Sequence, residues 1–539
     1  MKKIIAYILL VAILFSFDGI WAKNEPNDKE KEIRAFLGEA YIADEDYQSA
    51  IEEYNEILKE DPKNVKARIG LADILSWEGK FKDAIKLYRE VLRDEYDREA
   101  KRKLADVLSW DKKYSKTIFL YNELLDEKYD KRIACQKARV LGWWKKYDES
   151  LKAYRDAYRK SKDELIALEM SAKEAYWNSR VEEAITAYSE LIEKDPENVE
   201  AMFDLSQIYS YQSMWKQATG EYEKILEVHS GNFRAREGLE KAELISSHIL
   251  SNTAYDYFEA DSPSRHNDIR RHSSFEEVSV PINDSLKITA ATYLTTRYFR
   301  DFNDVFENND AIKAVFVKGP DYRIEGFYSF FAYNKGIKAM HNFGGVFDVR
   351  IFDIGTANFS YERERLENNS TVIREHYYRD RFKERIDIDV NKWLKLGADF
   401  IFAYYSDYNY KTEPGFDLLY FFSIDPLRFS VKYRYYFREF SEKEDQYFSP
   451  KGFTVNKITL NWRHYLNKEE VFFGANDLYY DLNYEVKIDS ETIVGHGFSG
   501  ELNWDINKRL NINVKGKILN SSANVYNDKS FIASVKYYF

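Results

Sequence analysis

The spacing of apolar and polar residues changes near residue 250 and divides the chain into two parts. Before that point tyrosines recur every 33 or 34 residues, each four residues after a small side chain. Residues four apart lie on one face of a helix. After residue 250 apolar and polar residues alternate with a period of two, which is typical of strands. The sequence therefore predicts an α-helical repeat domain followed by a β domain.

A repeat of this length indicates pairs of antiparallel helices that are stable only when they stack. The recurring residues are Tyr54, Tyr88, Tyr121, Tyr154, Tyr188 and Tyr222. In the first repeat, the residues at the expected consensus offsets are Leu37, Gly38, Tyr41, Ala50, Tyr54 and Pro62. On these residues the segment resembles the tetratricopeptide-repeat family. We expect a solenoid of about six repeats with a capping helix over residues 33–248.

A second row of aromatic residues follows the same period. It consists of Trp77, Trp110, Trp143, Trp177 and Tyr211, and a polar row stands four positions earlier at Asp73, Asp106, Arg139, Lys173 and Gln207. In the family that the repeats resemble, this position tends to face the concave groove. The resemblance implies a surface that stacks on sugar rings or grips a partner protein. Alternatively, the tryptophans pack between repeats and the polar row is a solvated face.

The alternating segments after residue 250 predict an antiparallel barrel in a membrane. In one of them Phe429, Val431, Tyr433 and Tyr435 alternate with Ser430, Lys432 and Arg434. About 16 such segments occur, with 12–16 defensible, and aromatic residues gather toward their ends. A soluble β-sandwich would also alternate, but its outer face rarely carries so many aromatic residues. We therefore expect a transmembrane β-barrel over residues 249–539.

Charged residues on the polar face of these strands are expected to line a wet lumen. The cations are Lys432, Arg434, Arg463, Lys515, Lys517 and Lys536, and the acids are Asp387, Asp389, Asp399 and Glu501. The cations lie mostly on late strands, where they would guide an anionic polymer. The simpler alternative is that these cations and acids pair with one another.

The last nine residues, FIASVKYYF, alternate in the same way and end on Phe539. A final strand with a terminal aromatic residue resembles those of outer-membrane barrels. The resemblance implies that the barrel assembly machinery recognises this strand, with Phe539 as part of the signal.

The N-terminus indicates export from the cytoplasm. Lys2 and Lys3 precede an apolar stretch from Ile4 to Phe17, and a small residue follows at Ala22, so residues 1–22 are predicted to be a cleaved signal peptide and 23–32 a linker. The apolar stretch is shorter than the roughly 20 residues that span a bilayer. We expect a protein of the Gram-negative outer membrane, in contact with its lipid, with the helical domain in the periplasm.

Charge and motifs narrow the functional classes. A net charge of -11 and a pI near 5.5 argue against nucleic-acid binding. No nucleotide-binding or hydrolase motif is present in the sequence, and we expect neither cofactor, metal nor catalysis. His496, Ser499 and Glu501 share one predicted strand, but alternation puts His496 on the face opposite the other two unless a bulge intervenes.

A signal peptide, a repeat solenoid and a C-terminal barrel, in that order, resemble bacterial exopolysaccharide export porins, such as the poly-N-acetylglucosamine and cellulose exporters. They also resemble YaiO-type outer-membrane barrels that follow such repeats. The resemblance implies a porin-like protein whose solenoid binds a periplasmic protein or a nascent polysaccharide. The alternative is a scaffold for periplasmic proteins, anchored by a closed barrel.

Overall fold

The computed structural model describes residues 26–539 except 45, 231, 263–266, 300–301, 303, 320, 352–353, 468–471 and 523–526. The expected signal peptide lies outside the described residues. The chain divides into two compact units, Met1–Met170 and Ser171–Phe539. The boundary falls within helix α10, so the later helices belong to the same unit as the strands.

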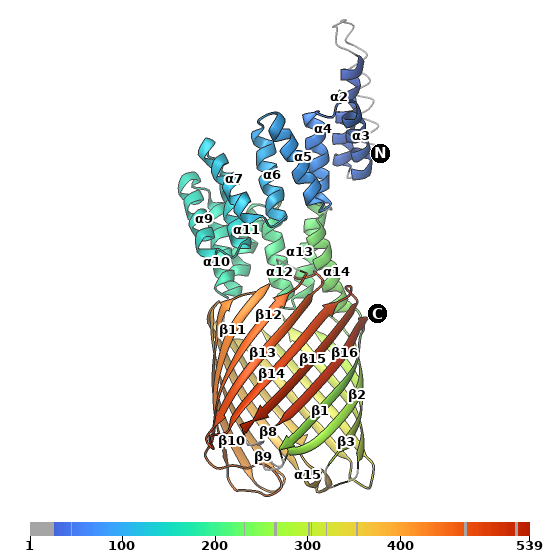
Figure 1. Ribbon diagram of the computed structural model, residues 1–539, viewed down its shortest axis with the longest axis vertical. Coiled ribbons are helices and arrows are strands. Elements are labelled where there is room, and N and C mark those ends of the chain that lie inside the picture. Colours follow the sequence, from blue (N-terminus) through green and yellow to red (C-terminus); the bar gives the residue numbers. More distant parts are fainter. Residues whose placement is uncertain are drawn as a thin grey trace. The chain divides into compact units, whose positions relative to one another are not determined.

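Thirteen helices precede the first strand in the described part of the chain (Figure 1). They are α2 (Pro26–Ala43), α3 (Tyr47–Glu60), α4 (Val65–Trp77), α5 (Phe81–Asp94), α6 (Arg98–Trp110), α7 (Tyr114–Glu127), α8 (Lys131–Trp143), α9 (Tyr147–Ser161), α10 (Glu164–Trp177), α11 (Val181–Lys194), α12 (Val199–Tyr211), α13 (Trp215–Val228) and α14 (Phe233–Ser247). They form six antiparallel pairs and a final single helix, as the repeat period predicts. Residues 26–32, which we assigned to a linker, are helical.

The recurring tyrosines form the centre of each repeat. All six side chains are at most 2% exposed. The fit around Tyr54 depends on two glycines, because a Cβ atom at Gly70 would lie 2.4 Å from its ring and one at Gly38 would lie 2.8 Å from it. These separations are too short for any larger residue, so the glycines let neighbouring helices approach.

Sixteen strands follow and form a closed antiparallel barrel in sequential order (Figure 1). They are β1 (Leu250–Ser262), β2 (Asn267–Pro281), β3 (Leu286–Tyr298), β4 (Val305–Lys318), β5 (Tyr322–Tyr333), β6 (Met340–Ile351), β7 (Gly355–Arg365), β8 (Tyr378–Asn391), β9 (Leu394–Tyr405), β10 (Tyr410–Ser423), β11 (Leu427–Phe440), β12 (Phe453–Tyr465), β13 (Leu478–Asp489), β14 (Val494–Asp505), β15 (Leu510–Ser521) and β16 (Asp528–Tyr538). Helix α15 (Ser370–Arg374) lies between β7 and β8. The predicted fold class and strand number are confirmed.

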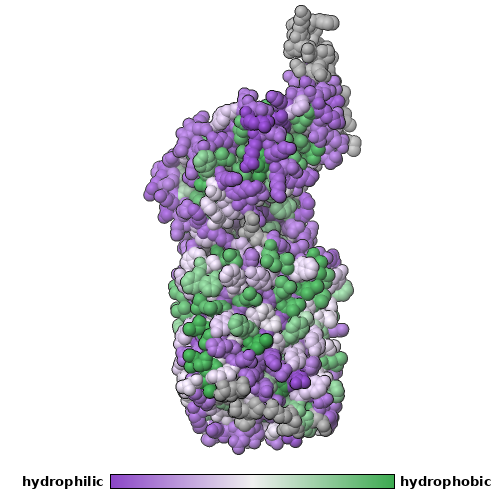
Figure 2. Space-filling model, in the orientation of Figure 1, coloured by the Kyte–Doolittle hydropathy of each residue, from purple (hydrophilic) through white to green (hydrophobic). Residues whose placement is uncertain are grey.

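The two faces of the wall differ as the alternation predicts. On β12, Ile458 and Trp462 are 50% and 46% exposed, whereas Arg463 pairs with Asp481 on the opposite face. Hydrophobic residues gather over the barrel wall on the side that Figure 2 shows, and hydrophilic residues dominate the helical surface. An apolar exterior around a charged interior is the pattern of a barrel in lipid. Among the described helices, none combines the length and apolar character needed to cross a membrane.

The final strand closes the barrel. β16 pairs with β1 from Leu250↔Tyr538 to Ala260↔Asp528, and the Phe539 amide donates to the Ile249 carbonyl at 2.9 Å. Phe539 is 63% exposed, and its ring contacts that of Tyr537. The terminal aromatic residue therefore lies on the outer face, beside the strand that follows the last repeat helix.

Replacing Phe539 with aspartate should reduce the amount of folded barrel in the membrane. The change puts a carboxylate on an apolar outer face, where charge is costly. Heat-dependent mobility of the membrane fraction on a gel measures folded barrel, and Phe539→Tyr is the matched control. Wild-type insertion of Phe539→Asp would contradict this role.

Candidate functional site

The predicted lumen residues all lie on the inner face of the barrel. We call the barrel end where α14 leads into β1 the helix end, and the opposite end the loop end. The strand register places the inward residues on β8, β9, β11, β12, β14, β15 and β16. They are Asp387, Asp389, Asp399, Lys432, Arg434, Arg463, Glu501, Lys515, Lys517 and Lys536.

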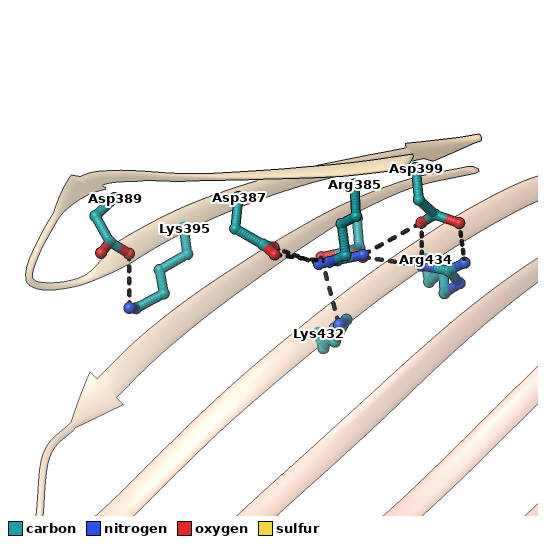
Figure 3. Close-up of polar contacts among 8 residues, drawn as sticks. Arg385, Asp387, Asp389, Lys395, Asp399, Lys432 and Arg434 are labelled. Atoms are coloured by element: carbon teal, nitrogen blue, oxygen red, sulfur yellow. Dashed lines mark hydrogen bonds and ion pairs between the residues drawn. The ribbon is translucent and has the colours of Figure 1, made fainter. Parts of the chain in front are cut away.

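The centre of this set is a network of ion pairs across four strands (Figure 3). Arg434 contacts Asp399 at 2.9 Å and Asp417 at 3.0 Å. Arg385 contacts the same two carboxylates at 3.2 and 2.9 Å, and Lys432 reaches Asp417 at 3.3 Å. The side chains of Asp399 and Asp417 are only 1% and 5% exposed. Burial leaves these acids dependent on their cations.

Most of the other predicted lumen charges also pair. Asp389 contacts Lys395 at 2.6 Å, apart from the central network in Figure 3. Arg463 contacts Asp481 at 2.9 Å. The pair of Lys515 with Glu501 is looser, at 3.9 Å, and the Lys515 side chain is 55% exposed. Mutual pairing, the simpler of our two interpretations, therefore describes most of the wall.

Three inward lysines near the helix end are different. Lys287 of β3, Lys313 of β4 and Lys536 of β16 are electrostatic neighbours. None of the three has a carboxylate within ion-pair distance among the described residues. The nearby Glu277 accepts hydrogen bonds from Asn252 and Tyr293 instead. The sequence analysis included Lys536 but missed the other two, although their alternation with apolar neighbours was the available signal.

The connection between β7 and β8, residues 366–377, spans the loop end of the barrel. Ile373 of α15 packs against residues of β1, β2 and β4, whereas Val372 packs against residues of β9 and β11. These two groups of strands lie on opposite sides of a 16-stranded ring. Both side chains are at most 1% exposed. We refer to residues 366–377 as the spanning loop.

Buried charges also hold the spanning loop. Glu367 contacts Arg297 of β3 at 2.8 Å, and Arg297 pairs at 2.5 Å with Glu307 of β4. The Arg297 and Glu307 side chains are each 3% exposed. On the other side, Asn369 donates to the Gln446 carbonyl at 2.8 Å. The loop is therefore fixed at both walls in this structure, and no sequence pattern predicted it.

In the helical domain, the tryptophan row packs between repeats. The ring of Trp77 lies 5.7 Å from that of Tyr47 in the preceding repeat, and Trp110 lies 6.4 Å from Phe81 in the same way. Trp143 and Tyr114 both pack against one buried cluster, which includes Tyr121 and Leu124. Trp77, Trp110, Trp143 and Trp177 are half-buried. The alternative of packing between repeats is thus observed for Trp77 and Trp110, and all four side chains of the row keep part of their surface exposed.

The polar row binds the hydroxyl groups of the buried tyrosines. Tyr88 donates to Asp73, and Tyr121 donates to Asp106, which also pairs with Arg102. Burial raises the pKa of the Asp106 carboxyl to about 6. A buried hydroxyl needs such an acceptor, so Asp73 and Asp106 have a structural role in their repeats.

Where the residue of the row is a base, it instead pairs with an acid of the next repeat that accepts the tyrosine hydroxyl. Tyr154 donates at 2.8 Å to Glu169 of the next repeat, and Arg139 pairs with that same carboxylate at 2.6 Å. In the following repeat, Lys173 and Tyr188 meet in the same way at Asp204. The sequence analysis missed these two acids, whose spacing of 15 or 16 residues after each tyrosine was the available signal.

The last member of the aromatic row contacts the barrel's own loop. Tyr211 packs edge to face against Phe473 of the β12–β13 connection, at 5.9 Å between rings, and Trp215 lies 6.0 Å from it. Gln207 accepts a hydrogen bond from the Phe473 amide at 2.7 Å. We predicted that the aromatic row binds apolar side chains of a partner protein. At the final repeat, its member Tyr211 instead contacts Phe473 of this chain.

Charged residues add to the contact between α14 and the barrel. Lys508, between β14 and β15, pairs with Glu237 at 3.2 Å and also with Glu240. Lys241 lies 3.6 Å from Asp505 at the end of β14. These contacts attach the last helices to the turns at the helix end.

The candidate catalytic residues of β14 do not meet. The register through Gly497 is regular, without a bulge. His496 lies on the outer face, where Tyr484 contacts its Nδ1 at 2.8 Å, whereas Ser499 and Glu501 lie on the inner face. No common site joins the three residues.

Comparisons with known proteins identify the helical domain. Family models of the tetratricopeptide repeat match residues 41–107 and 169–210. No curated protein matches the chain. A solved bacterial polysaccharide outer membrane secretin is 12% identical, covers 55% of this chain and 99% of its own, and has a TM-score of 0.45.

Two solved proteins are similar over the helical part. A tetratricopeptide repeat protein from Parabacteroides merdae is 16% identical over 40% of this chain and 87% of its own, with a TM-score of 0.30. Pseudomonas aeruginosa pilF is 17% identical over 40% of this chain and 98% of its own, with a TM-score of 0.28.

Asp106→Asn should change how the stability of the helical domain depends on pH. Because the folded pKa of Asp106 is raised to about 6, above the value near 4 of an unfolded chain, its protonated form favours folding below about pH 4. That contribution is lost as the pH rises from 4 to 6. Unfolding of the helices, followed by circular dichroism, should show that the variant loses less stability than the wild type between pH 4 and 6. Asp83→Asn, at an exposed position, is the control. If the stability of Asp106→Asn depends on pH in the same way as that of the wild type, the raised pKa of Asp106 is wrong.

Arg434→Gln should destabilise the barrel by about 3 kcal/mol, because it leaves two buried carboxylates short of a cation. The double variant Arg434→Gln/Asp399→Asn should recover much of that loss. Guanidinium unfolding of the detergent-solubilised protein measures both. Lys515→Gln, which removes a loose and exposed pair, should change stability by less than about 1 kcal/mol. A double variant no more stable than Arg434→Gln would argue against the network.

Proposed function

We propose that this chain, with tetratricopeptide repeats ahead of a 16-stranded barrel, exports an exopolysaccharide across the outer membrane of a Gram-negative bacterium. The helix end of the barrel faces the periplasm and the loop end faces the outside. The barrel assembly machinery inserts the protein, and the repeats bind a periplasmic partner or the nascent chain.

The observation that carries this proposal is the polar interior of a barrel of this size. Closed barrels of 16 strands are wide enough to leave an aqueous channel unless a segment of the chain occupies it. The inner face carries charged side chains at many levels, and some are well exposed, including Lys515. The cargo class follows from the domain order, which resembles that of exopolysaccharide exporters.

The unpaired lysines at the helix end support an entrance for a polar chain. Lys287, Lys313 and Lys536 face the lumen without a paired carboxylate among the described residues. A cationic cluster on one side of an entrance attracts anionic groups through the focused field of the lumen. The half-buried tryptophans of the repeats offer ring surfaces that stack on sugars or on apolar side chains.

The spanning loop favours a second function, the periplasmic scaffold. If the loop keeps the barrel closed, the barrel only anchors the repeats, which then recruit other periplasmic proteins. Phe473 seated against Tyr211 illustrates how the repeat surface holds an apolar side chain. In both proposals the barrel is not an enzyme, and His496 on the outer face supports this interpretation.

Replacing residues 367–376 with a glycine-serine linker should raise the conductance of the barrel in planar bilayers. Residues 372 and 373, which seal the loop against both walls, are removed, while the strands on either side are kept. The wild-type protein should show a small or intermittent conductance, and the variant a large and stable one. Soluble polysaccharide fragments should block the current reversibly.

A matched control is Val372→Ser/Ile373→Ser, which keeps the loop length but weakens its apolar contacts. It should open the barrel more often than wild type without changing the fully open conductance. If the loop replacement folds, as heat-dependent mobility reports, yet carries no current, the conduit proposal fails and the scaffold is the better account.

A further inference from the structure

A cavity of about 270 Å³ lies against the inner wall near the loop end. Strands β8, β10, β11, β12, β13 and β16 contribute to its lining, together with Leu366 and Asn368 of the spanning loop. A chain leaving the barrel would pass this cavity before it reached the loop. Its volume suits one sugar ring rather than an oligosaccharide. We refer to it as the loop-end cavity.

The charged lining of the loop-end cavity is mostly basic. Four cations from four different strands line it, Arg379, Lys411, Arg438 and Lys487, whereas Asp528 is the one acid among its lining residues in the described part of the chain. This imbalance differs from the central network, where cations and acids alternate.

Two of the cations share a single acid that is not itself among the lining residues. Glu413 accepts from Arg438 Nε at 2.6 Å and from Lys411 at 3.2 Å. The terminal nitrogens of Arg438 make no hydrogen bond within the described residues. Arg379 donates from Nε to Glu364 at 2.6 Å and from Nη1 to Tyr405, which leaves its Nη2 without an acceptor there. Guanidinium groups with spare N–H donors suit the two oxygens of a carboxylate.

Aromatic side chains complete the lining. Tyr436 of β11 lies under the Arg438 guanidinium, 5.6 Å from its carbon, and Phe448 and Phe453 pack edge to face at 5.3 Å. Apolar ring faces beside a few directed polar groups are the usual composition of a small-molecule site. The same combination matches a sugar, whose C–H face is apolar and whose rim is polar.

We propose that the loop-end cavity binds an anionic sugar unit, such as a uronate, within the exported chain. Its carboxylate faces Arg379, Arg438 and Lys487, and its ring lies against Tyr436 and the two phenylalanines. The proposal rests on the export function and specifies its cargo, because a basic cavity disfavours a cationic sugar and gives a neutral one no ionic contact. Occupation of the cavity places a sugar directly beneath the spanning loop.

Calorimetry on the full-length protein in detergent tests the binding separately from conduction. The probes are a galacturonate trimer, maltotriose and a glucosamine trimer, which are anionic, neutral and cationic. The anionic trimer should bind at least tenfold more tightly than the other two, and added salt should weaken its binding. Equal affinity for all three, or no binding of the anionic trimer, would overturn the proposal.

Three substitutions locate the site. Lys487→Gln should weaken the affinity for the anionic trimer about tenfold, as expected for the loss of one charge-assisted contact. Asp528→Asn removes the acid from the lining and should tighten binding severalfold, a gain that a folding defect would not produce. Lys515→Gln, on the inner face but outside the cavity, should leave affinity unchanged. If Lys515→Gln weakens binding as much as Lys487→Gln, the general field of the lumen binds the sugar and the proposal fails.

The bilayer and calorimetric measurements separate the two proposals. Selective binding of the anionic trimer without conductance in the loop-replaced protein would support the cavity and overturn the conduit. Conductance without selective binding would support the conduit and overturn the anionic subsite.

Discussion

Backbone hydrogen bonding in lipid is the constraint on which the rest of this structure depends. A strand edge facing hydrocarbon would leave its N–H and C=O groups without partners, so the sheet must close. The pairing of β1 with β16 provides that closure. It also brings the C-terminus beside the end of α14, because Leu250 pairs with Tyr538. Closure fixes which residues face lipid and which face the lumen at every position.

Once the barrel is closed, its interior must accommodate many charges at close range. The central network does so with shared partners, since Arg385 and Arg434 both contact Asp399 and Asp417. The loop-end cavity and the lysines near the helix end depart from this balance, and both carry excess positive charge. The interior thus combines a neutralised middle with a basic cluster near each end, as the proposed passage of an anionic chain requires.

The helical repeats must also accommodate buried polar groups, because each has a tyrosine at its centre. A large ring fills the space between helices, and its hydroxyl then needs an acceptor. Aspartate supplies it from the same repeat, as at Asp106, or an acid from the next repeat supplies it with a base as counter-ion, as at Glu169. The second arrangement ties neighbouring repeats together. The polar row is therefore largely part of the core, and the exposed ring surface along the repeats belongs to the tryptophans and to Tyr211.

The sequence by itself determined the two-part fold, a barrel of about 16 strands, the face of each lumen residue and the separation of His496 from Ser499. These follow from local periodicity, because a helix repeats every 3.6 residues and a strand every two. Only the tertiary structure decided which charges meet, that Tyr211 holds Phe473, and that the spanning loop crosses the loop end. Such contacts join residues far apart in sequence, and an irregular loop has no periodicity to reveal it. The loop-end cavity depends on the local periodicity and on the tertiary structure. Alternation turns its cations inward, and closure of the barrel brings the strands that carry these cations together around the cavity.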